Sequence, residues 1–425
     1  MSNIKSQIQS AFSIANKNPL IPEFFLFSFT TFLLLISRLV AYFWAAKLLG
    51  PETWGKWFLF DLVIIYGPNF QFGTLNAMNK DVPLYRGKQN FDKIVEIQSN
   101  SFGFQIIISI LCAFFIFLYG FVKGPLELKW TYLFFCLFFL FHMIYLWEQF
   151  YLKSMAFFNY FSQQQAFFAF FFVLFTIPFT YWKGLSGFIT GQLLATSIMV
   201  VLIWKQKVSV VPRWNRTKII QLIRIGFPIM LVGLIFSLFK TIDRWIVIAF
   251  FTEKQLGYFS IAIMSFNVLL ILQMVVAQQV YPRMAEAWGR TQEIKEILKW
   301  VRLQIGVSVL LSILAATIFA FLIKFIINHF LIEYSPGLAA VYPMLFGPVF
   351  LSFAGAFGNL LNTINKQNHY LAVQIFTLPI FIGLDIWFVK NGYGLPGVAL
   401  GTSITFFIYS LILSMVGIYH LKNSV

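Results

Sequence analysis

The sequence has 425 residues, of which 59% are hydrophobic and only 11% are charged. Soluble domains carry about 25% charged residues, so this chain has too little polar surface for a water-soluble globular protein. Its formal net charge of +16 would suit a nucleic-acid-binding protein, but the order of apolar and basic segments indicates that the charge reflects membrane topology instead.

Apolar segments follow one another along the whole chain, each close to the roughly 20 residues that cross a bilayer as an α-helix. The apolar runs are continuous and do not alternate with period two, so they predict helices and not barrel strands. We therefore expect an all-α polytopic membrane protein with about twelve transmembrane helices. The predicted spans are 23–48, 56–78, 95–121, 130–152, 161–182, 186–204, 222–250, 256–281, 297–325, 338–363, 371–389 and 397–421.

Two polar segments lie outside these spans. Ile4, Ile8 and Phe12 recur at helical spacing, which predicts an amphipathic helix on the cytoplasmic membrane surface. A basic stretch separates the sixth span from the seventh. The expected segments are therefore a cytoplasmic N-terminus at 1–21, an N-terminal lobe at 22–204, a basic cytoplasmic linker at 205–221 and a C-terminal lobe at 222–425.

Basic residues are distributed unevenly between the two ends of the spans. With the N-terminus in the cytoplasm, twenty Lys and Arg residues fall on the inner side and eight on the outer side. This bias places both termini in the cytoplasm and fits an even number of spans. The charge is thus a topology signal, and no nucleic-acid partner is expected. The eight outer residues are Lys47, Lys56, Lys123, Lys129, Lys183, Lys254, Lys324 and Lys390.

The chain repeats itself at a period of a little over about 200 residues. The sixth span begins GLSGFITG at 184–191 and the twelfth begins GLPGVALG at 394–401. Likewise, WGKWF at 54–58 opens the second span and LGYFS at 256–260 opens the eighth. Repeats of six spans share one orientation, so we expect two tandem six-helix bundles, an arrangement that suits alternating access. A duplicated static scaffold is the alternative, and charges within the spans argue against it.

Three cations fall inside predicted spans, where a charged side chain costs roughly 2.5–3.5 kcal/mol on insertion scales. Lys240 and Arg244 are four residues apart, so they share one side of the seventh span. Arg38 lies midway along the first span, the equivalent helix of the other half. We predict that these three residues line a cationic cavity that binds an anionic group, phosphate most of all.

Four acids also fall inside the spans. Asp243 either takes part in the cavity or forms an internal ion pair with a neighbouring cation. Glu148 either binds H⁺ or Na⁺ or pairs with Lys153, and Asp61 is a second candidate for ion coupling. Asp385, about one turn from the outer end of the eleventh span, is expected to reach the interface by snorkelling.

The sequence offers little for an enzyme. No Walker A glycine loop occurs, and no loop between spans exceeds about 20 residues, which leaves no room for a soluble catalytic domain. We therefore expect neither catalytic residues, nor a metal site, nor a cofactor. The histidines, which form no metal-binding motif, are His142, His329, His369 and His420.

Short motifs recur in a characteristic order along the chain: LGPETWG at 49–55, LNAMNKDVP at 75–83, the dipeptide Asp243-Arg244, LGYFS at 256–260 and YPR at 281–283. In order and spacing they resemble the bacterial polysaccharide-repeat flippases. These are the Wzx-type O-antigen exporters of the multidrug/oligosaccharidyl-lipid/polysaccharide (MOP) superfamily. The resemblance extends from about residue 25 to about residue 420.

The resemblance implies a MATE-like fold and a function. Members of this family move an undecaprenyl-pyrophosphate-linked oligosaccharide across the bacterial inner membrane for the synthesis of O-antigen, and so of lipopolysaccharide, or of capsule or exopolysaccharide. The pyrophosphate would fit the cavity predicted at Arg38, Lys240 and Arg244. Expected partners are this lipid-linked substrate, membrane lipid and polysaccharide polymerase machinery. We expect a functional monomer, coupled to H⁺ or Na⁺ if any ion is used.

Two alternatives stay open. A multidrug antiporter of the same superfamily would export mainly cationic compounds, and the three cations within the spans weigh against it. An intramembrane glycan-modifying enzyme would need a large outer loop or a catalytic histidine in a polar pocket, and neither is evident.

Overall fold

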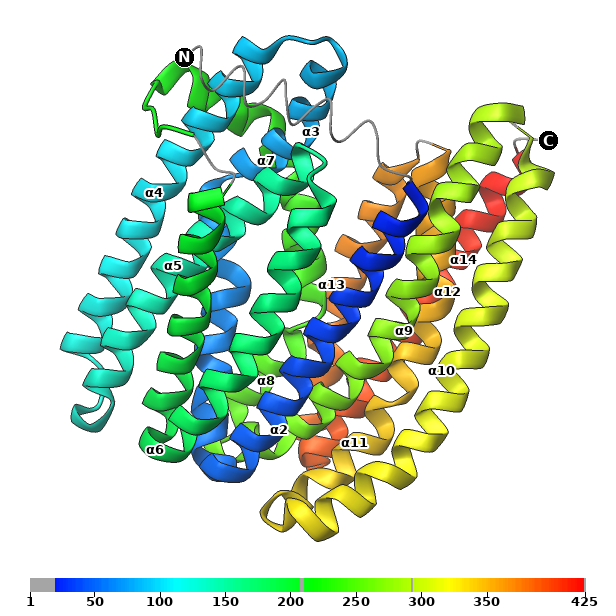
Figure 1. Cartoon of the computed structure of the whole chain (residues 1–425). Helices are drawn as coiled ribbons and strands as arrows, with labels where there is room; N and C mark the ends of the chain where they lie inside the picture. The colour runs from blue at the N-terminus through cyan, green and yellow to red at the C-terminus, as the bar shows by residue number, and fades with distance from the viewer. Residues whose placement is uncertain (1–19, 207–209, 292, 365, 424–425) are drawn as a thin grey trace. The chain divides into compact units, whose positions relative to one another are not determined.

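A computed structural model describes residues 20–206, 210–291, 293–364 and 366–423, and every long regular element in these ranges is an α-helix (Figure 1). The amphipathic helix predicted for the N-terminus falls on residues 1–19, outside the described residues. The helices of the first half are α2 (Leu20–Tyr66), α3 (Thr74–Gly87), α4 (Phe91–Val122), α5 (Lys129–Ser154) and α6 (Phe158–Gln206). Those of the second half are α7 (Arg216–Phe239), α8 (Ile242–Phe250), α9 (Glu253–Thr291), α10 (Ile294–Phe330), α11 (Leu338–Met344), α12 (Phe346–Thr363), α13 (Gln367–Lys390) and α14 (Gly394–Asn423).

Ten segments of the described chain are long and apolar enough to cross a membrane. Two of them, Leu26–Gln71 with 46 residues and Phe158–Leu202 with 45, are about twice the length of one crossing. Each bends near its middle, at Gly50 with φ 71° and at Gly184 with φ 58°, where glycine adopts a backbone conformation that other residues avoid. Counting these two as pairs gives the expected twelve spans, and both bends fall between predicted spans. The all-α polytopic fold is confirmed.

Three predicted spans are interrupted. The second continues from α2 through the 3₁₀ helix η1 (Gly67–Gln71) before α3 begins. The seventh breaks after Phe239 and resumes as α8, and the tenth is divided between α11 and α12. The sequence did not predict these breaks because apolar composition continues across each of them.

The helices form two compact units, which we describe separately. The first unit contains residues 1–49 and 60–234, and the second contains 50–59 and 235–425. These units follow contacts, whereas the lobes predicted at 22–204 and 222–425 follow the sequence repeat, so the lobe division stays a prediction. Most of α7 thus belongs to the first unit, and residues 50–59, which include the first four residues of the predicted second span, belong to the second unit.

A close backbone approach explains why α7 belongs to the first unit. Gly226 of α7 faces Gly73, which lies between η1 and α3 with φ 86°. A Cβ on either glycine would overlap backbone atoms of the other segment. Glycine at both positions therefore lets the two backbones touch, as small residues do where helices pack in membranes.

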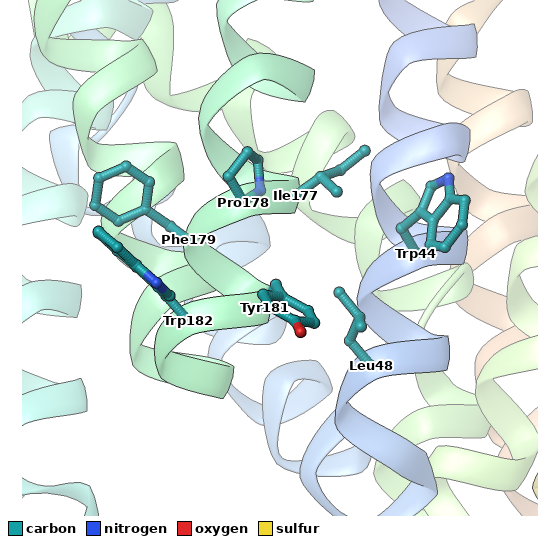
Figure 2. A pocket seen from close by; sticks show the side chains of 7 residues that line it. All are labelled: Trp44, Leu48, Ile177, Pro178, Phe179, Tyr181 and Trp182. Carbon is teal, nitrogen blue, oxygen red and sulfur yellow. The ribbon is translucent and has the colours of Figure 1, made fainter.

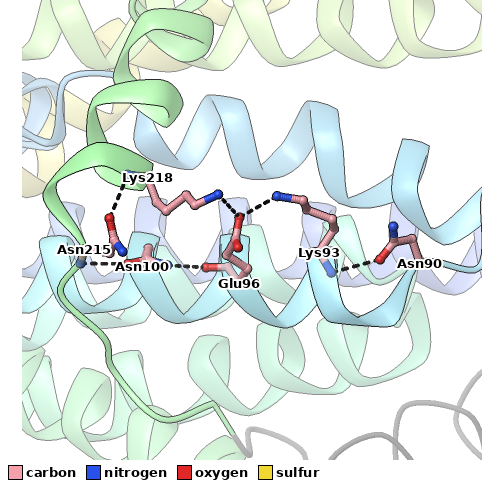
Figure 3. Close-up of polar contacts among 6 residues, drawn as sticks. All are labelled: Asn90, Lys93, Glu96, Asn100, Asn215 and Lys218. Atoms are coloured by element: carbon pink, nitrogen blue, oxygen red, sulfur yellow. Dashed lines mark hydrogen bonds and ion pairs between the residues drawn. The ribbon is translucent and has the colours of Figure 1, made fainter.

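The linker before α7 is held against α4 in the first unit (Figure 3). The backbone N–H of Arg213 donates to the Ser99 carbonyl at 2.9 Å, and that of Asn215 donates to Asn100 Oδ1 at 3.0 Å. A Cβ at Gly103 would overlap the Arg213 carbonyl oxygen, so this glycine makes room for the linker. Residues 210–215 are therefore a docked segment of the fold.

The equivalent glycines of the sequence repeat meet in the second unit. A Cβ at Gly55 would overlap the carbonyl of Glu253, and one at Gly257 would overlap the carbonyl of Pro51. Lys56 adds a 3.7 Å ion pair to Glu253. The start of the second span and the start of α9 thus pack backbone against backbone, which explains why residues 50–59 belong to this unit.

Candidate functional site

Both units bury polar side chains among apolar helices, and in each unit some of these side chains surround a predicted site residue. In the first unit, Gln149 of α5 donates one hydrogen bond to Tyr145 Oη at 2.7 Å and another to Gln164 Oε1 of α6 at 3.2 Å. Gln164 donates in turn to Glu148 Oε2 at 3.3 Å. We call these four residues the Glu148 cluster.

Glu148 is fully buried, and the alternative of pairing it with Lys153 is not what the structure has. The described residues include no Glu148–Lys153 ion pair, and the Lys153 ammonium instead lies 4.7 Å from the centre of the Phe161 ring. Glu148 Oε1 accepts no hydrogen bond within the described part of the chain. A carboxyl group in such a place is most stable with a bound proton or cation.

Arg38 lies next to the Glu148 cluster. Its guanidinium, on α2, interacts electrostatically with His142 and Tyr145 of α5, and Tyr145 belongs to the cluster. Asp61 also lies in the first unit, half-buried further along α2, and is not a member of the cluster. The structure therefore groups Arg38 and Glu148 with neighbouring polar side chains and leaves Asp61 elsewhere on the same helix.

In the second unit, the break between α7 and α8 positions three predicted site residues. Asp243 occupies the first turn of α8, where its Oδ1 accepts the Arg244 backbone N–H at 2.7 Å. The Arg244 guanidinium lies 5.6 Å from the centre of the Phe58 ring. Lys240 lies 4.8 Å from the Phe236 ring and interacts electrostatically with Arg244. Lys240 lies in the turn between the two helices, so the continuous helical spacing that predicted a shared side is interrupted there, and the shared side stays a prediction.

Asp385 does not snorkel, and that prediction was wrong. Its side chain is fully buried on α13, and neither carboxylate oxygen has a hydrogen-bond partner among the described residues. Gly401 of α14 makes room for it, because a Cβ there would overlap Asp385 Oδ1. Asp385 also interacts electrostatically with Asp243 of α8, a helix that packs against α13. We call Asp243 and Asp385 the acid pair.

The acid pair was only half predicted from the sequence. Asp243 was a candidate, but the position of Asp385 near a helix end indicated an interfacial residue. The signal that could have found it was Gly401, the second glycine of the GxxxG motif that begins the twelfth span. A glycine at a helix contact marks a place where something large approaches. At Gly401 the approaching group is the Asp385 carboxylate.

The three predicted cations are divided between the units. Arg38 belongs to the first unit, and Lys240 and Arg244 belong to the second. The structure brings Lys240 and Arg244 together, while a cavity shared by all three residues stays a prediction.

Comparison with known proteins places this geometry in a fold. An inward-facing multidrug resistance MATE family transporter of the MOP superfamily matches with a TM-score of 0.81 at 13% sequence identity, covering 92% of this chain and 95% of that one. The outward-facing conformation of such a transporter matches with a TM-score of 0.66 at 15% sequence identity, covering 99% of this chain and 96% of that one. A MATE mutant matches with a TM-score of 0.68 at 15% sequence identity, covering 99% of this chain and 97% of that one.

The chain has the MATE transporter fold. No protein-family model matches the sequence, and no curated protein matches it either. The structures it matches are transporters and not enzymes, and its apolar helices make it a multi-pass membrane protein.

Proposed function

We propose that the protein is a flippase for an undecaprenyl-pyrophosphate-linked oligosaccharide repeat unit in a bacterial inner membrane. It would move this lipid from the inner to the outer leaflet by alternating access, for the synthesis of O-antigen, capsule or exopolysaccharide. The observation that carries the proposal is the set of three cations within predicted membrane spans: Arg38 in α2, Lys240 in the turn between α7 and α8, and Arg244 in α8.

The chemistry of these cations favours a phosphate-bearing substrate. Arginine presents a planar fork that binds phosphate oxygens in pairs, and lysine adds a point charge. Arg244 is buried, and intramembrane cations in transporters commonly face a substrate pathway and seldom the lipid. A pyrophosphate brings enough negative charge to balance more than one of them.

Deletion of the gene in its host tests this proposal. Loss of surface polysaccharide, with lipid-linked repeat units accumulating on the cytoplasmic side, is the expected result. Unchanged polysaccharide would overturn it. Restoring export by expressing the wild-type protein separates a direct effect from an effect on neighbouring genes.

A multidrug antiporter is the second candidate, favoured by buried acids in both units. Glu148, Asp243 and Asp385 could balance a cationic compound, and the matched structures include multidrug transporters. The same deletion separates the two candidates, because an antiporter would change sensitivity to cationic drugs and leave surface polysaccharide intact.

We further propose that the acid pair couples transport to an H⁺ or Na⁺ gradient. Two buried carboxyl groups on packed helices would repel each other when both are ionised, so binding a cation or a proton stabilises them. Asp61 and Glu148 are the other candidates for ion coupling, and their effect on transport is to be compared with that of the acid pair. Transport measured in proteoliposomes with only a Na⁺ gradient or only a pH gradient distinguishes the two ions.

A further inference from the structure

Two further features of the described chain lie outside the residues proposed for transport. One is an apolar pocket of about 440 Å³ in the first unit, lined by Trp44 and Leu48 of α2 and by side chains between Ile177 and Trp182 of α6 (Figure 2). Nothing in the structure shows what covers this pocket, so we assign no ligand to it. The other feature is a pair of histidines at one end of the second unit.

His369 and His420 lie side by side at the ends of two packed helices. His369 is in the first turn of α13 and His420 is in the last turn of α14, and these two helices pack against each other. The centres of the two imidazole rings are 4.7 Å apart, and the ring planes make an angle of 75°. The two residues are far apart in the sequence, so no short metal-binding motif could indicate that they meet.

Two neighbouring imidazoles from different helices can hold a transition-metal ion between them. Neutral imidazole is the commonest protein ligand for such ions, and it suits Zn²⁺, Cu²⁺ and Ni²⁺. A ring nitrogen binds Zn²⁺ at about 2.0–2.1 Å, so two nitrogens that share one ion lie within roughly 4 Å of each other. His369 is exposed, and the last side-chain torsion of histidine is broad. A turn of this ring can therefore convert the present edge-to-face contact into shared coordination.

The charges around the histidine pair act in both directions. Lys366, just before α13, interacts electrostatically with His420 and opposes a bound cation, as does the N-terminus of α13. The C-terminus of α14 favours a cation, since its free carbonyls carry partial negative charge. Among the described residues no group of three or more His, Cys, Asp or Glu side chains could hold a metal ion. The protein would therefore supply two ligands here, and water would supply the others.

We propose that His369 and His420 bind one divalent transition-metal ion, and that this ion fastens α13 to α14. The two helices are joined at their other ends by the short turn at 391–393, so they form a helical hairpin whose open end carries the histidines. A link at the open end closes a long loop, and such links restrict the unfolded chain most. This inference goes beyond the proposed transport function, because the ion stabilises the second unit and does not drive transport.

Calorimetric titration of the purified, tag-free, full-length protein in detergent with ZnCl₂ tests the proposal. We expect a single Zn²⁺ ion to bind at about pH 7.5 and to be lost at about pH 5, because histidine, with an ordinary pKa of about 6.5, is then protonated and cannot bind a metal. His369→Gln and His420→Gln should each weaken binding at least about tenfold. The double variant should lose no more than either single variant, because a shared ion needs both rings.

His329→Gln is the matched control. This histidine is also exposed near the end of a helix, α10, but its ring packs on Phe325, with 4.3 Å between the ring centres. Its substitution should leave Zn²⁺ binding unchanged. Zn²⁺ should also raise the thermal midpoint of the wild type and of this control, but not that of His369→Gln or His420→Gln, because only a bound ion stabilises the folded state. Equal midpoints without Zn²⁺ confirm the fold of each variant.

Two results would overturn the proposal. Zn²⁺ affinity that is unchanged in both His369→Gln and His420→Gln would mean that the two rings only pack on each other. Losses that add up in the double variant would mean that each histidine binds metal separately. Because no transport is measured, these results are independent of whether the flippase proposal holds.

Discussion

Buried carboxyl groups are among the residues of this protein that packing alone does not explain. Asp385 is fully buried with no hydrogen-bond partner among the described residues, and Glu148 is fully buried with a partner for one oxygen only. Burying an ionised carboxylate without compensation is expensive, so such groups bind a proton, a cation or a substrate. Both positions are therefore functional candidates.

Replacing Asp385 with Asn tests the acid pair with little change in shape. We expect transport to lose its dependence on the driving ion gradient, because the amide neither ionises nor binds a cation well. The thermal midpoint in detergent should stay equal or rise, since the unpaired carboxylate is removed. Glu127→Gln, an exposed substitution in the connection between α4 and α5, should leave both measurements unchanged. Full gradient dependence in Asp385→Asn would contradict a coupling role for this residue.

Asp81 on α3 gives a pH-dependent prediction outside the spans. Burial raises the pKa of this carboxyl group above its ordinary value of 3.8, and Lys80 opposes the shift only in part. The folded state therefore binds the proton more readily than the unfolded state, and stability falls as pH rises from 3.8 through the raised pKa. Asp81→Asn should be more thermostable than the wild type at neutral pH, and the gain should shrink as the pH approaches 3.8. A gain independent of pH would contradict this cause.

Between elements, glycine contacts decide which segments pack together. Gly55 with Gly257, and Gly73 with Gly226, bring backbones of distant segments into contact. Gly401 does the same for a side chain, that of Asp385. Helix association in a membrane depends on such close approach, because lipid is as apolar as the side chains it would replace.

Gly257→Ala is expected to destabilise the second unit. Its Cβ would overlap the Pro51 carbonyl, and relieving an overpacked contact costs about 1–3 kcal/mol. Gly306→Ala in α10 is the control, because nothing lies near its Cβ and alanine favours a helix by up to about 1 kcal/mol over glycine. Thermal unfolding in detergent should show a lower midpoint for the first variant and an equal or higher one for the second. Equal midpoints would contradict the contact.

Gly103→Val is expected to displace the linker from α4. Its side chain would occupy the place of the Arg213 carbonyl, so the hydrogen bond from Arg213 to Ser99 would break. Limited trypsin digestion should then cleave after Arg213 or Arg216 faster than in the wild type. Gly87→Val, where nothing lies near the added Cβ, is the control and should be cleaved at the wild-type rate. Slow cleavage in both variants would indicate that other contacts hold the linker.

At the scale of the whole molecule, the proposed transport depends on cations contributed by both units. Phosphate bound by Arg38 and Arg244 would neutralise charges that are otherwise costly within apolar helices. Under the proposed function, such binding would explain why a chain with so few charged residues retains arginine in its first and seventh spans.

Arg38→Ala and Arg244→Ala are each expected to abolish export while the protein still inserts in the membrane. Losing one charge-assisted hydrogen-bond partner costs about 1.5–3 kcal/mol, which corresponds to a roughly tenfold to hundredfold loss of substrate affinity. Surface polysaccharide in a complemented deletion strain provides the measurement, with membrane-fraction immunoblots to confirm insertion. Arg302→Ala, exposed on α10, should export normally. Normal export from both site variants would exclude the cationic cavity.

The sequence by itself determined the fold class, the count of about twelve spans and the boundaries near Gly50 and Gly184, where the structure bends. These depend on the length of apolar runs and on local helix breakers, which are properties of consecutive residues. Only the tertiary structure decided that Asp385 is buried beside Gly401, that the linker docks on α4 and that a pocket opens at Trp44. Such features depend on how each helix is rotated about its axis and which distant segment meets it. When nearly every face of a helix is apolar, no periodicity in the sequence records that rotation.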